Sequence, residues 1–399
     1  MRILMICNKA PYPANDGSSI AIYNMAKGLL ENNVDVDLLA INTKKHFKPD
    51  NNVPDKFKTD TNYQSVFHNT NTSLIGAFLN LFSRQSYFVS RFLFENFGEE
   101  LKQKLKLNKY DIIQIEGLFM AVYIPLIKKI SSAKIVLRAH NIEHVIWERH
   151  IQNEKNILKK WYLNLQNKRL KHFETDILNS VDAVVTITTE DEKYIRDKFP
   201  SQNITTAITG ISLSDYPLAQ KSAEPNTVFY FGSMDWLPNQ EAVEWFVSNC
   251  WQKIKQEIPS AKFIIAGRNM PERIKALEAN GIKCVENVAD KNEFYHTYQL
   301  MIVPLLSGSG LRIKIIEGMA FGKTIVSTSL GAEGIPVNNG HEVIIADSAD
   351  EIVKAVVNLL TNHQEFEKIG LNARQFAEKN FVNKNIVGHL TNFYTQLLK

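Results

Sequence analysis

The chain has 399 residues, of which 44% are hydrophobic and 22% charged, so it is long enough for two domains of ordinary globular composition. Its formal net charge is only +4, and residues 1–217 carry 28 Lys/Arg against 23 Asp/Glu. That weak surplus argues against a nucleic-acid-binding protein, whereas it suits an anionic acceptor or a membrane surface.

In the first half of the chain, segments whose apolar residues have the spacing of a strand alternate with segments that have the spacing of a helix. An apolar strand at 2–8 is followed by a glycine-containing loop, a helix from residue 18 and a second strand at 34–42. Residues 42–73 are polar and predict a loop with one weak strand. Further strands are expected at 111–116, 134–140, 182–188 and 203–209, and the longest helix between them at about 142–179. Strands that alternate with helices indicate a parallel sheet.

Residues 74–97 combine many aromatic side chains with Arg84 and Arg91. Such a segment either lies on a membrane interface or packs its aromatic rings on the sheet. No clean polar face opposes the rings, which favours packing on the sheet.

A linker at 209–226, with Gly210, Pro217 and Pro225, separates a second alternating series of strands and helices. The expected domains are residues 1–215 and 216–384. The sequence therefore predicts an α/β protein with two parallel sheets.

A glycine-rich turn joins a buried strand at 300–306 to a helical pattern. Ser309 is predicted to cap the helix, and Gly310, Leu311 and Arg312 would then carry amide groups without partners inside it. Free amides and the helix dipole favour an anion, most naturally a phosphate.

Charged residues follow this turn: Arg312 lies in the first turn, and Lys314 and Glu317 share one face of the helix. Arg312 and Lys314 suit a diphosphate, and Glu317, one turn after Lys314, suits the hydroxyls of a ribose. A capped surface helix with one Lys–Glu pair is the alternative. Gly17 is a further candidate donor-binding residue, since it lies where a loop becomes a helix at the carboxyl end of the first sheet, the edge at which open α/β sheets bind ligands.

Several segments resemble glycosyltransferase family 4, in the order that the family has them. The longest is GSGLRIKIIEGMAFGKTIVSTSLGAEGI, beginning at Gly308. The others are PYPANDGSSIAIYN near the start, HNIE at His140, FGSMDWLPNQEAVEWF at Phe231 and IIAGRNMPERIKAL at Ile264. The resemblance is thinnest between about Thr43 and Ser83.

The resemblance implies two Rossmann-like domains whose parallel sheets face each other across a cleft, the GT-B arrangement. The first domain would bind the acceptor and the second a nucleotide-sugar donor, and the last helix, 385–399, would pack back on the first domain. His140, which ends a strand, would be the acceptor-side catalytic residue. Arg268 matches the arginine of the family's GR pattern, beside the donor.

Two departures from the family stand out. Many members have two glutamates eight residues apart, but the position eight before Glu317 is Ser309. The Arg and Lys that often follow the first donor-domain strand are replaced by GSMDW from Gly232. Arg312, Arg268 and Lys314 are the substitutes available to neutralise a diphosphate.

The sequence also contains a pattern of a different functional class. His140, Glu143 and His144 match the H-x-x-E-H pattern of zinc peptidases. That pattern needs both histidines in a helix and a third ligand, whereas His140 ends a strand. We expect no metal and no cofactor, because no clustered carboxylate pair accompanies the glycine turn.

The resemblance thus implies a retaining glycosyltransferase that moves a sugar from a nucleoside diphosphate to a glycan, lipid-linked or other cell-envelope acceptor. A nucleotide-sugar epimerase and a catalytically silent sugar-binding subunit remain alternatives. Three scattered cysteines, a start without a signal-peptide pattern and no apolar run of ~18 residues indicate the cytoplasm, with peripheral membrane contact left open.

Overall fold

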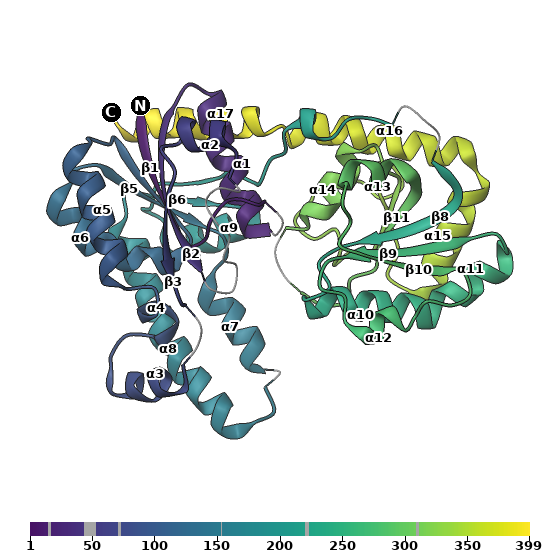
Figure 1. The fold of residues 1–399 in the computed structure, drawn as a ribbon, viewed down its shortest axis with the longest axis horizontal. Coiled ribbons are helices and arrows are strands. Elements are labelled where there is room, and N and C mark those ends of the chain that lie inside the picture. Colours follow the sequence, from purple (N-terminus) through teal and green to yellow (C-terminus); the bar gives the residue numbers. More distant parts are fainter. Residues whose placement is uncertain (15–16, 44–52, 71–72, 153, 220–222, 309–310) are drawn as a thin grey trace. The chain divides into compact units, whose positions relative to one another are not determined.

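The structure is a computed structural model of the chain that describes residues 1–14, 17–43, 53–70, 73–152, 154–219, 223–308 and 311–399 (Figure 1). It divides into two compact units. Unit 1 comprises Met1–Gly210 and Asn383–Lys399, and unit 2 comprises Ile211–Val382. The chain thus leaves unit 1 at residue 210, five residues before the expected boundary, and returns to it at residue 383.

Unit 1 is built on a parallel sheet that has seven strands among the described residues, in the order β3-β2-β1-β4-β5-β6-β7. The strands are β1 (Arg2–Cys7), β2 (Asp35–Thr43), β3 (Gln64–His68), β4 (Ile112–Glu116), β5 (Lys134–Ala139), β6 (Ala183–Thr186) and β7 (Ile204–Thr206). Leu4 and Ile6 of β1 belong to one buried cluster, and Ile3 and Met5 to another. The central strand is therefore buried on both faces, which explains its unbroken apolar sequence.

Helices and short helical turns surround this sheet. They are α1 (Gly17–Glu31), α2 (Asp55–Asp60), α3 (Leu74–Leu79), η3 (Asn80–Phe82), α4 (Tyr87–Ser90), α5 (Glu95–Leu107), η4 (Leu118–Tyr123), α6 (Ile124–Ile130), α7 (Glu143–Gln152), α8 (Ile157–Ser180), α9 (Thr189–Lys198) and α17 (Asn383–Leu397). The C-terminal helix α17 packs on α1 so closely that a Cβ atom at Gly28 would lie 2.5 Å from Val387. Glycine at this position lets the two helices approach each other.

Two predictions for unit 1 need correction. The single helix expected at about 142–179 is two helices, α7 and α8, because Asn156 caps the second one by accepting a hydrogen bond from the Lys159 amide at 3.0 Å. The aromatic stretch 74–97 does not pack on the sheet as a whole. Phe88 and Phe97 are buried, but Phe78 and Phe82 are exposed.

Unit 2 is also parallel, with six strands among its described residues in the order β10-β9-β8-β11-β12-β13. The strands are β8 (Glu224–Phe231), β9 (Lys262–Gly267), β10 (Ile282–Glu286), β11 (Tyr298–Val303), β12 (Ile325–Ser327) and β13 (Ile344–Ile345). The helices are η5 (Leu213–Asp215), α10 (Leu237–Phe246), the π-helical turn η6 (Val247–Trp251), α11 (Gln252–Glu257), α12 (Glu272–Lys275), α13 (Lys291–Thr297), α14 (Ile313–Ala320), α15 (Ala349–Thr361) and α16 (His363–Asn380). The two Rossmann-like sheets confirm the predicted α/β fold.

No helix in the described part of the chain combines the length and the apolar character needed to cross a membrane.

Candidate functional site

The carboxyl ends of β4 and β5 bring His140 against a buried carboxylate. Glu116 is the last residue of β4 and pairs in register with Arg138 of β5, two residues before His140. The His140 Nε2 atom lies 2.7 Å from Glu116 Oε2, and Arg138 Nη1 donates to the same oxygen at 3.0 Å. Gln114 Nε2 donates to the other oxygen, Oε1, at 2.5 Å. The carboxylate is therefore hydrogen-bonded on both oxygens.

The charge of Glu116 determines which nitrogen of the His140 imidazole carries hydrogen. Burial alone raises the pKa of this carboxyl, but the opposing effects of Arg138 and of the His140 hydrogen bond prevail and lower it to about 2. An ionised carboxylate only accepts hydrogen bonds, so His140 Nε2 carries hydrogen. In a neutral imidazole Nδ1 is then the acceptor, and it is the nitrogen available to a reacting hydroxyl.

The same network ties the edge of the sheet to two helices. Tyr394 of α17 donates its hydroxyl to Gln114 Oε1 at 2.7 Å, and Arg138 Nη1 also donates to the Ala21 carbonyl of α1 at 3.2 Å. Neither Glu116 nor Arg138 was singled out from the sequence. Their signal was present, because each is a charged residue at or near the carboxyl end of a largely apolar strand.

The H-x-x-E-H pattern does not form a zinc site here. His144 lies in α7, where its Nδ1 is 2.6 Å from Glu174 Oε2 and its Nε2 is 3.0 Å from the Tyr194 hydroxyl. His140 is held by Glu116 instead, so the two histidines have separate partners. Within the described ranges no group of three or more His, Cys, Asp or Glu is arranged to hold a metal ion. Burial, reinforced by Glu174, raises the pKa of Glu143 to about 7.

In unit 2 the helix after the glycine turn begins later than predicted. Its first residue is Ile313 and its N-cap is Arg312, which has no side-chain capping bond. The prediction that Ser309 caps the helix is therefore wrong, since residues 311 and 312 have a non-helical backbone and the first helical amides belong to Ile313 and its successors. The predicted donor-binding residues Ser309 and Gly310 lie outside the described residues. Leu311 is half-buried just before the helix.

Lys314 of α14 reaches back to the end of β8. Its Nζ donates to the Tyr230 hydroxyl and to Asn239 Oδ1, both at 2.8 Å. A Cβ atom at Gly232 would lie 2.7 Å from this amine, so a larger residue there would displace the lysine side chain. Burial, and next the nearby Arg312 charge, lower the pKa of Lys314 to about 7. The amine thus lies beside the loop from which the family's Arg and Lys are missing.

Two arginines border the same loop. Arg268, directly after β9, donates from Nε to the Ser233 hydroxyl at 2.8 Å. The buried guanidinium of Arg312 lies 5.7 Å from the ring centre of Trp236. The loops after β8, β9 and β11 therefore gather three cationic side chains at the carboxyl edge of the unit 2 sheet, the usual place for a ligand in open α/β sheets.

Glu317 lies one turn beyond Lys314 and is buried. Its Oε1 accepts hydrogen bonds from the Tyr216 hydroxyl at 2.9 Å and from Lys291 Nζ at 2.6 Å. Lys314 and Glu317 therefore do not form the surface ion pair of the alternative interpretation, because the two side chains have different partners. In the described structure no hydrogen bond reaches Glu317 Oε2, which can therefore accept one from a ligand.

Gly17 belongs to unit 1, where it begins α1, whereas the other predicted donor-binding residues belong to unit 2. It is exposed, and a Cβ atom there would meet nothing within 4 Å. Nothing around Gly17 thus requires glycine for space.

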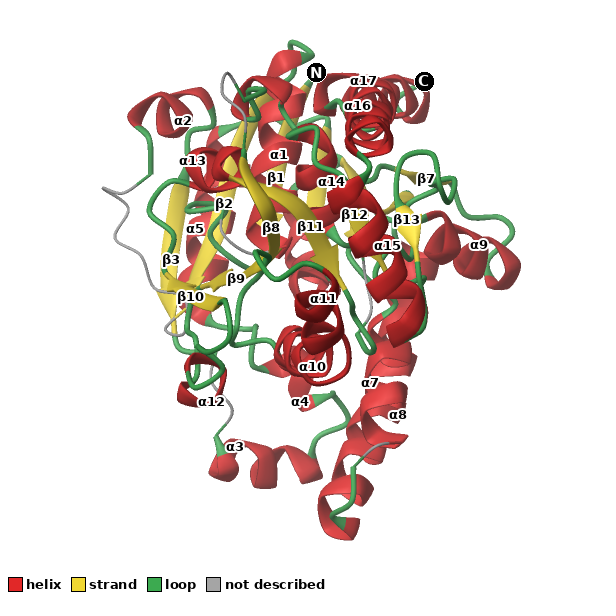
Figure 2. Ribbon diagram, turned by 90° about the vertical axis from the view of Figure 1, so that its right-hand side faces the viewer, coloured by secondary structure: helices red, strands yellow, loops and turns green. Residues whose placement is uncertain are grey.

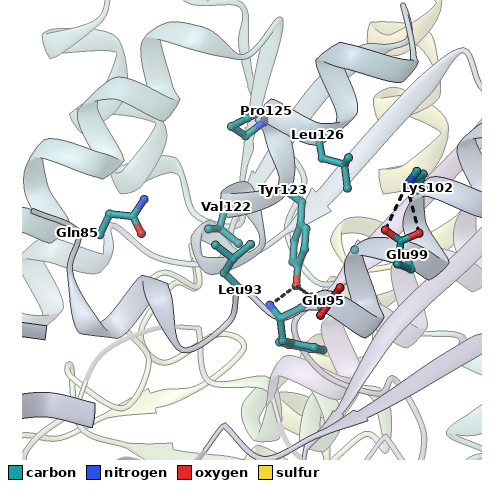
Figure 3. Close-up of a pocket in the computed structure, with 11 residues that line it drawn as sticks. Gln85, Leu93, Glu95, Glu99, Lys102, Val122, Tyr123, Pro125 and Leu126 are labelled. Carbon is teal, nitrogen blue, oxygen red and sulfur yellow. Dashed lines mark hydrogen bonds and ion pairs between the residues drawn. The ribbon is translucent and has the colours of Figure 1, made fainter. Parts of the chain in front are cut away.

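A cavity of about 520 Å³ opens elsewhere in unit 1, between α5, η4 and α6 (Figure 3). The Tyr123 hydroxyl in its wall already bonds the Phe94 amide and the Phe92 carbonyl, and Lys102 pairs with Glu99. None of the predicted site residues lines it, so it is not the site that the sequence predicted.

Family profiles match both units. Glycosyltransferase Family 4 matches residues 15–215, and Glycosyl transferases group 1 matches residues 225–362. A Klebsiella pneumoniae protein described as an uncharacterized 44.6 kDa protein in cps region is 23% identical over 96% of this chain and 97% of its own length.

Solved structures agree with this fold. Sucrose-phosphate synthase from Thermosynechococcus elongatus is 15% identical with a TM-score of 0.72, and the match covers 100% of this chain and 99% of the synthase. Anabaena HepE in complex with UDP-glucose is 14% identical with a TM-score of 0.65, covering 99% of this chain and 100% of HepE. The chain belongs to glycosyltransferase family 4 and is a glycosyltransferase of the GT-B type.

Proposed function

We propose that the chain is a retaining hexosyltransferase that uses a nucleoside diphosphate sugar. The observation that carries this proposal is the cationic cluster of unit 2, where Arg268, Arg312 and Lys314 gather beside a carboxylate, Glu317, with one oxygen available. Three cations suit the two negative charges of a diphosphate, and a carboxylate suits the paired hydroxyls of a ribose.

In this proposal the protein itself neutralises the diphosphate. Lys314, Arg268 and Arg312 supply the positive charge, with the first amides of α14 adding the positive end of the helix dipole. No metal ion and no cofactor is then required. The UDP-glucose bound by HepE supports a nucleotide-sugar donor for a chain of this fold.

His140 serves the acceptor in this scheme. Its Nδ1 accepts a hydrogen bond from the reacting hydroxyl or the transferred sugar, while Glu116 holds the ring through Nε2. The acceptor oxygen forms a bond to the anomeric carbon as the bond from that carbon to the diphosphate breaks. The hydroxyl proton passes to His140 Nδ1, the nucleoside diphosphate leaves as its anion, and attack on the face that the diphosphate vacates retains the anomeric configuration.

The acceptor class is a cell-envelope glycan or a lipid-linked glycan, reached from the cytoplasm at the inner face of the membrane. The Klebsiella relative supports this class, because its description places it in cps region. The basic surplus of residues 1–217 is consistent with an anionic acceptor.

Product analysis after incubation with nucleotide sugars and envelope extracts tests the proposal. A thermal-shift screen first selects the donor, since a ligand at 100 times its dissociation constant adds about 2.7 kcal/mol of stability. The expected product is a glycosylated acceptor with the donor's anomeric configuration, read by NMR. Interconversion of the donor would identify an epimerase, inversion would refute retention, and donor binding without any turnover would indicate a silent subunit.

A further inference from the structure

An exposed apolar surface lies on two neighbouring segments of unit 1. Ile75, Phe78, Leu79 and Phe82 recur at i, i+3, i+4 and i+7 along α3 and η3, so they share one helical face. Ile157, Leu158 and Trp161 lie together at the start of α8. All seven side chains are 60 to 82% exposed, although apolar faces of helices are normally buried. We call these seven residues the apolar surface.

The two segments are fastened to each other on their other side. The Tyr162 hydroxyl donates to the Ala77 carbonyl at 3.3 Å, and Gln166 Nε2 donates to Asn80 Oδ1 at 3.0 Å. Arg169 donates to the carbonyls of Asn80 and Leu81 at 2.9 and 3.0 Å. Figures 1 and 2 both show α3 and the start of α8 at the same end of unit 1. Polar groups thus hold the segments together and leave the apolar side chains outward.

Charge distinguishes a bilayer from a second copy of the chain. The segments 73–86 and 154–169 contain six basic residues and one acidic residue, Glu154, which pairs with Lys159. Two copies meeting through this surface would bring like charges together, which disfavours self-association. Anionic lipid headgroups complement basic side chains around apolar ones that enter the interface.

We propose that the apolar surface docks unit 1 on an anionic phospholipid bilayer. Phe78, Phe82 and Trp161 enter the headgroup region, and basic residues such as Lys155 and Lys168 contact the lipid phosphates. This deepens the proposed use of a membrane-bound acceptor, but the docking itself needs neither donor nor acceptor.

Vesicle co-sedimentation of the full chain, without donor, tests this inference separately from transfer. The wild type should bind phosphatidylcholine vesicles containing phosphatidylglycerol at least tenfold more tightly than phosphatidylcholine alone, and high salt should weaken that binding. The triple variant Phe78→Ser, Phe82→Ser, Trp161→Ser should bind at least about tenfold more weakly. Leu371→Ser, at an exposed leucine of α16, is the matched control and should bind normally.

Charge reversal tests the basic residues in the same way. The double variant Lys155→Glu, Lys168→Glu should lose roughly 10- to 100-fold in binding to the anionic vesicles. Lys354→Glu, Lys379→Glu makes the same charge change at exposed positions of α15 and α16 and should bind as the wild type does. Trp161→Phe should also abolish most of the blue shift in tryptophan fluorescence that binding causes.

Three results would overturn the inference. They are wild-type binding by the triple variant, equal affinity for neutral and anionic vesicles, and a vesicle-free dimer that the triple variant abolishes. The last result would assign the apolar surface to a second copy of the chain. All substituted side chains are exposed, so the variants should fold, and an unchanged melting temperature checks this.

Discussion

At the carboxyl edge of unit 1 the buried charge of Glu116 is compensated within the protein, whereas at the edge of unit 2 Lys314 forms no ion pair with any described residue. Glu116 has Arg138 and His140 on one oxygen, and the pKa of its carboxyl falls to about 2. Among the described residues the Lys314 amine donates to the neutral oxygens of Tyr230 and Asn239, and its pKa falls to about 7. A paired charge holds a side chain in place, and an unpaired one awaits a ligand of opposite charge. The difference suggests that unit 1 orients a catalytic group and unit 2 binds an anion.

The largest expected effect comes from separating these two roles. His140→Ala should lower turnover by ~10²- to 10⁴-fold if the imidazole takes part in proton transfer, because His140 belongs to the acceptor side. Its donor affinity should stay nearly unchanged. Steady-state kinetics and calorimetric donor binding check both quantities.

Arg312→Ala is the reciprocal variant, and it should weaken donor binding as well as turnover. Wild-type turnover in His140→Ala would move the catalytic role elsewhere. Glu143 would be examined next, since its pKa of about 7 suits a general acid or base. Glu116→Gln sharpens the comparison further, because it removes the charge on the ring's partner and should lower turnover without changing donor affinity.

Glu317→Ala should weaken donor binding by roughly 10- to 150-fold, since a hydrogen bond to a charged group is worth about 1.5 to 3 kcal/mol. Calorimetry with the donor measures this loss. Tyr216→Phe is the control, because it removes one hydrogen bond to Oε1 but leaves Oε2 in place, and it should bind the donor almost normally. Unchanged affinity in a folded Glu317→Ala protein would rule out the ribose contact.

How far the sequence predicts these sites depends on whether a contact is local. The strand and helix pattern, His140 at a strand end and the basic and acidic residues of α14 all follow from nearby residues. The partners of Glu116 do not, because β4 and β5 are 22 residues apart at Glu116 and Arg138 and periodicity does not say which strands are neighbours. Likewise the start of α14 depends on the backbone of Arg312, and the outward face of α3 depends on contacts with α8.

Lys314 makes donor binding depend on pH. Its pKa is about 7 in the free protein, and a bound diphosphate would raise it, so binding takes up a proton above pH 7. Affinity for UDP-glucose should therefore fall as pH rises through 7, approaching about tenfold per pH unit until the pKa of the complex is reached. Each phosphate of this probe has one ester bond and one anhydride bond and therefore no second ionisation, so the probe itself does not titrate there.

Folding stability should change in the opposite direction over the same range. The unfolded chain has an ordinary lysine and binds the proton that folded Lys314 has lost, so the contribution of this residue to stability rises with pH between about 7 and 10.5. A fall in donor affinity is then not a loss of folded protein. Lys314→Met, of similar volume, should bind the donor weakly and without this pH dependence, and a persisting slope would assign the proton to another group.

The smallest expected effect is that of a chelator, which should leave transfer unchanged. In the proposed site Arg268, Arg312 and Lys314 balance the diphosphate, and side-chain cations of this kind remain in place when EDTA is added. Activity that disappears with EDTA and returns with Mg²⁺ or Mn²⁺ would refute this electrostatic account. Lys314→Met provides a sharper version of the test: if the lysine takes the place of a metal ion, added Mg²⁺ should restore part of the donor affinity in that variant and none in the wild type.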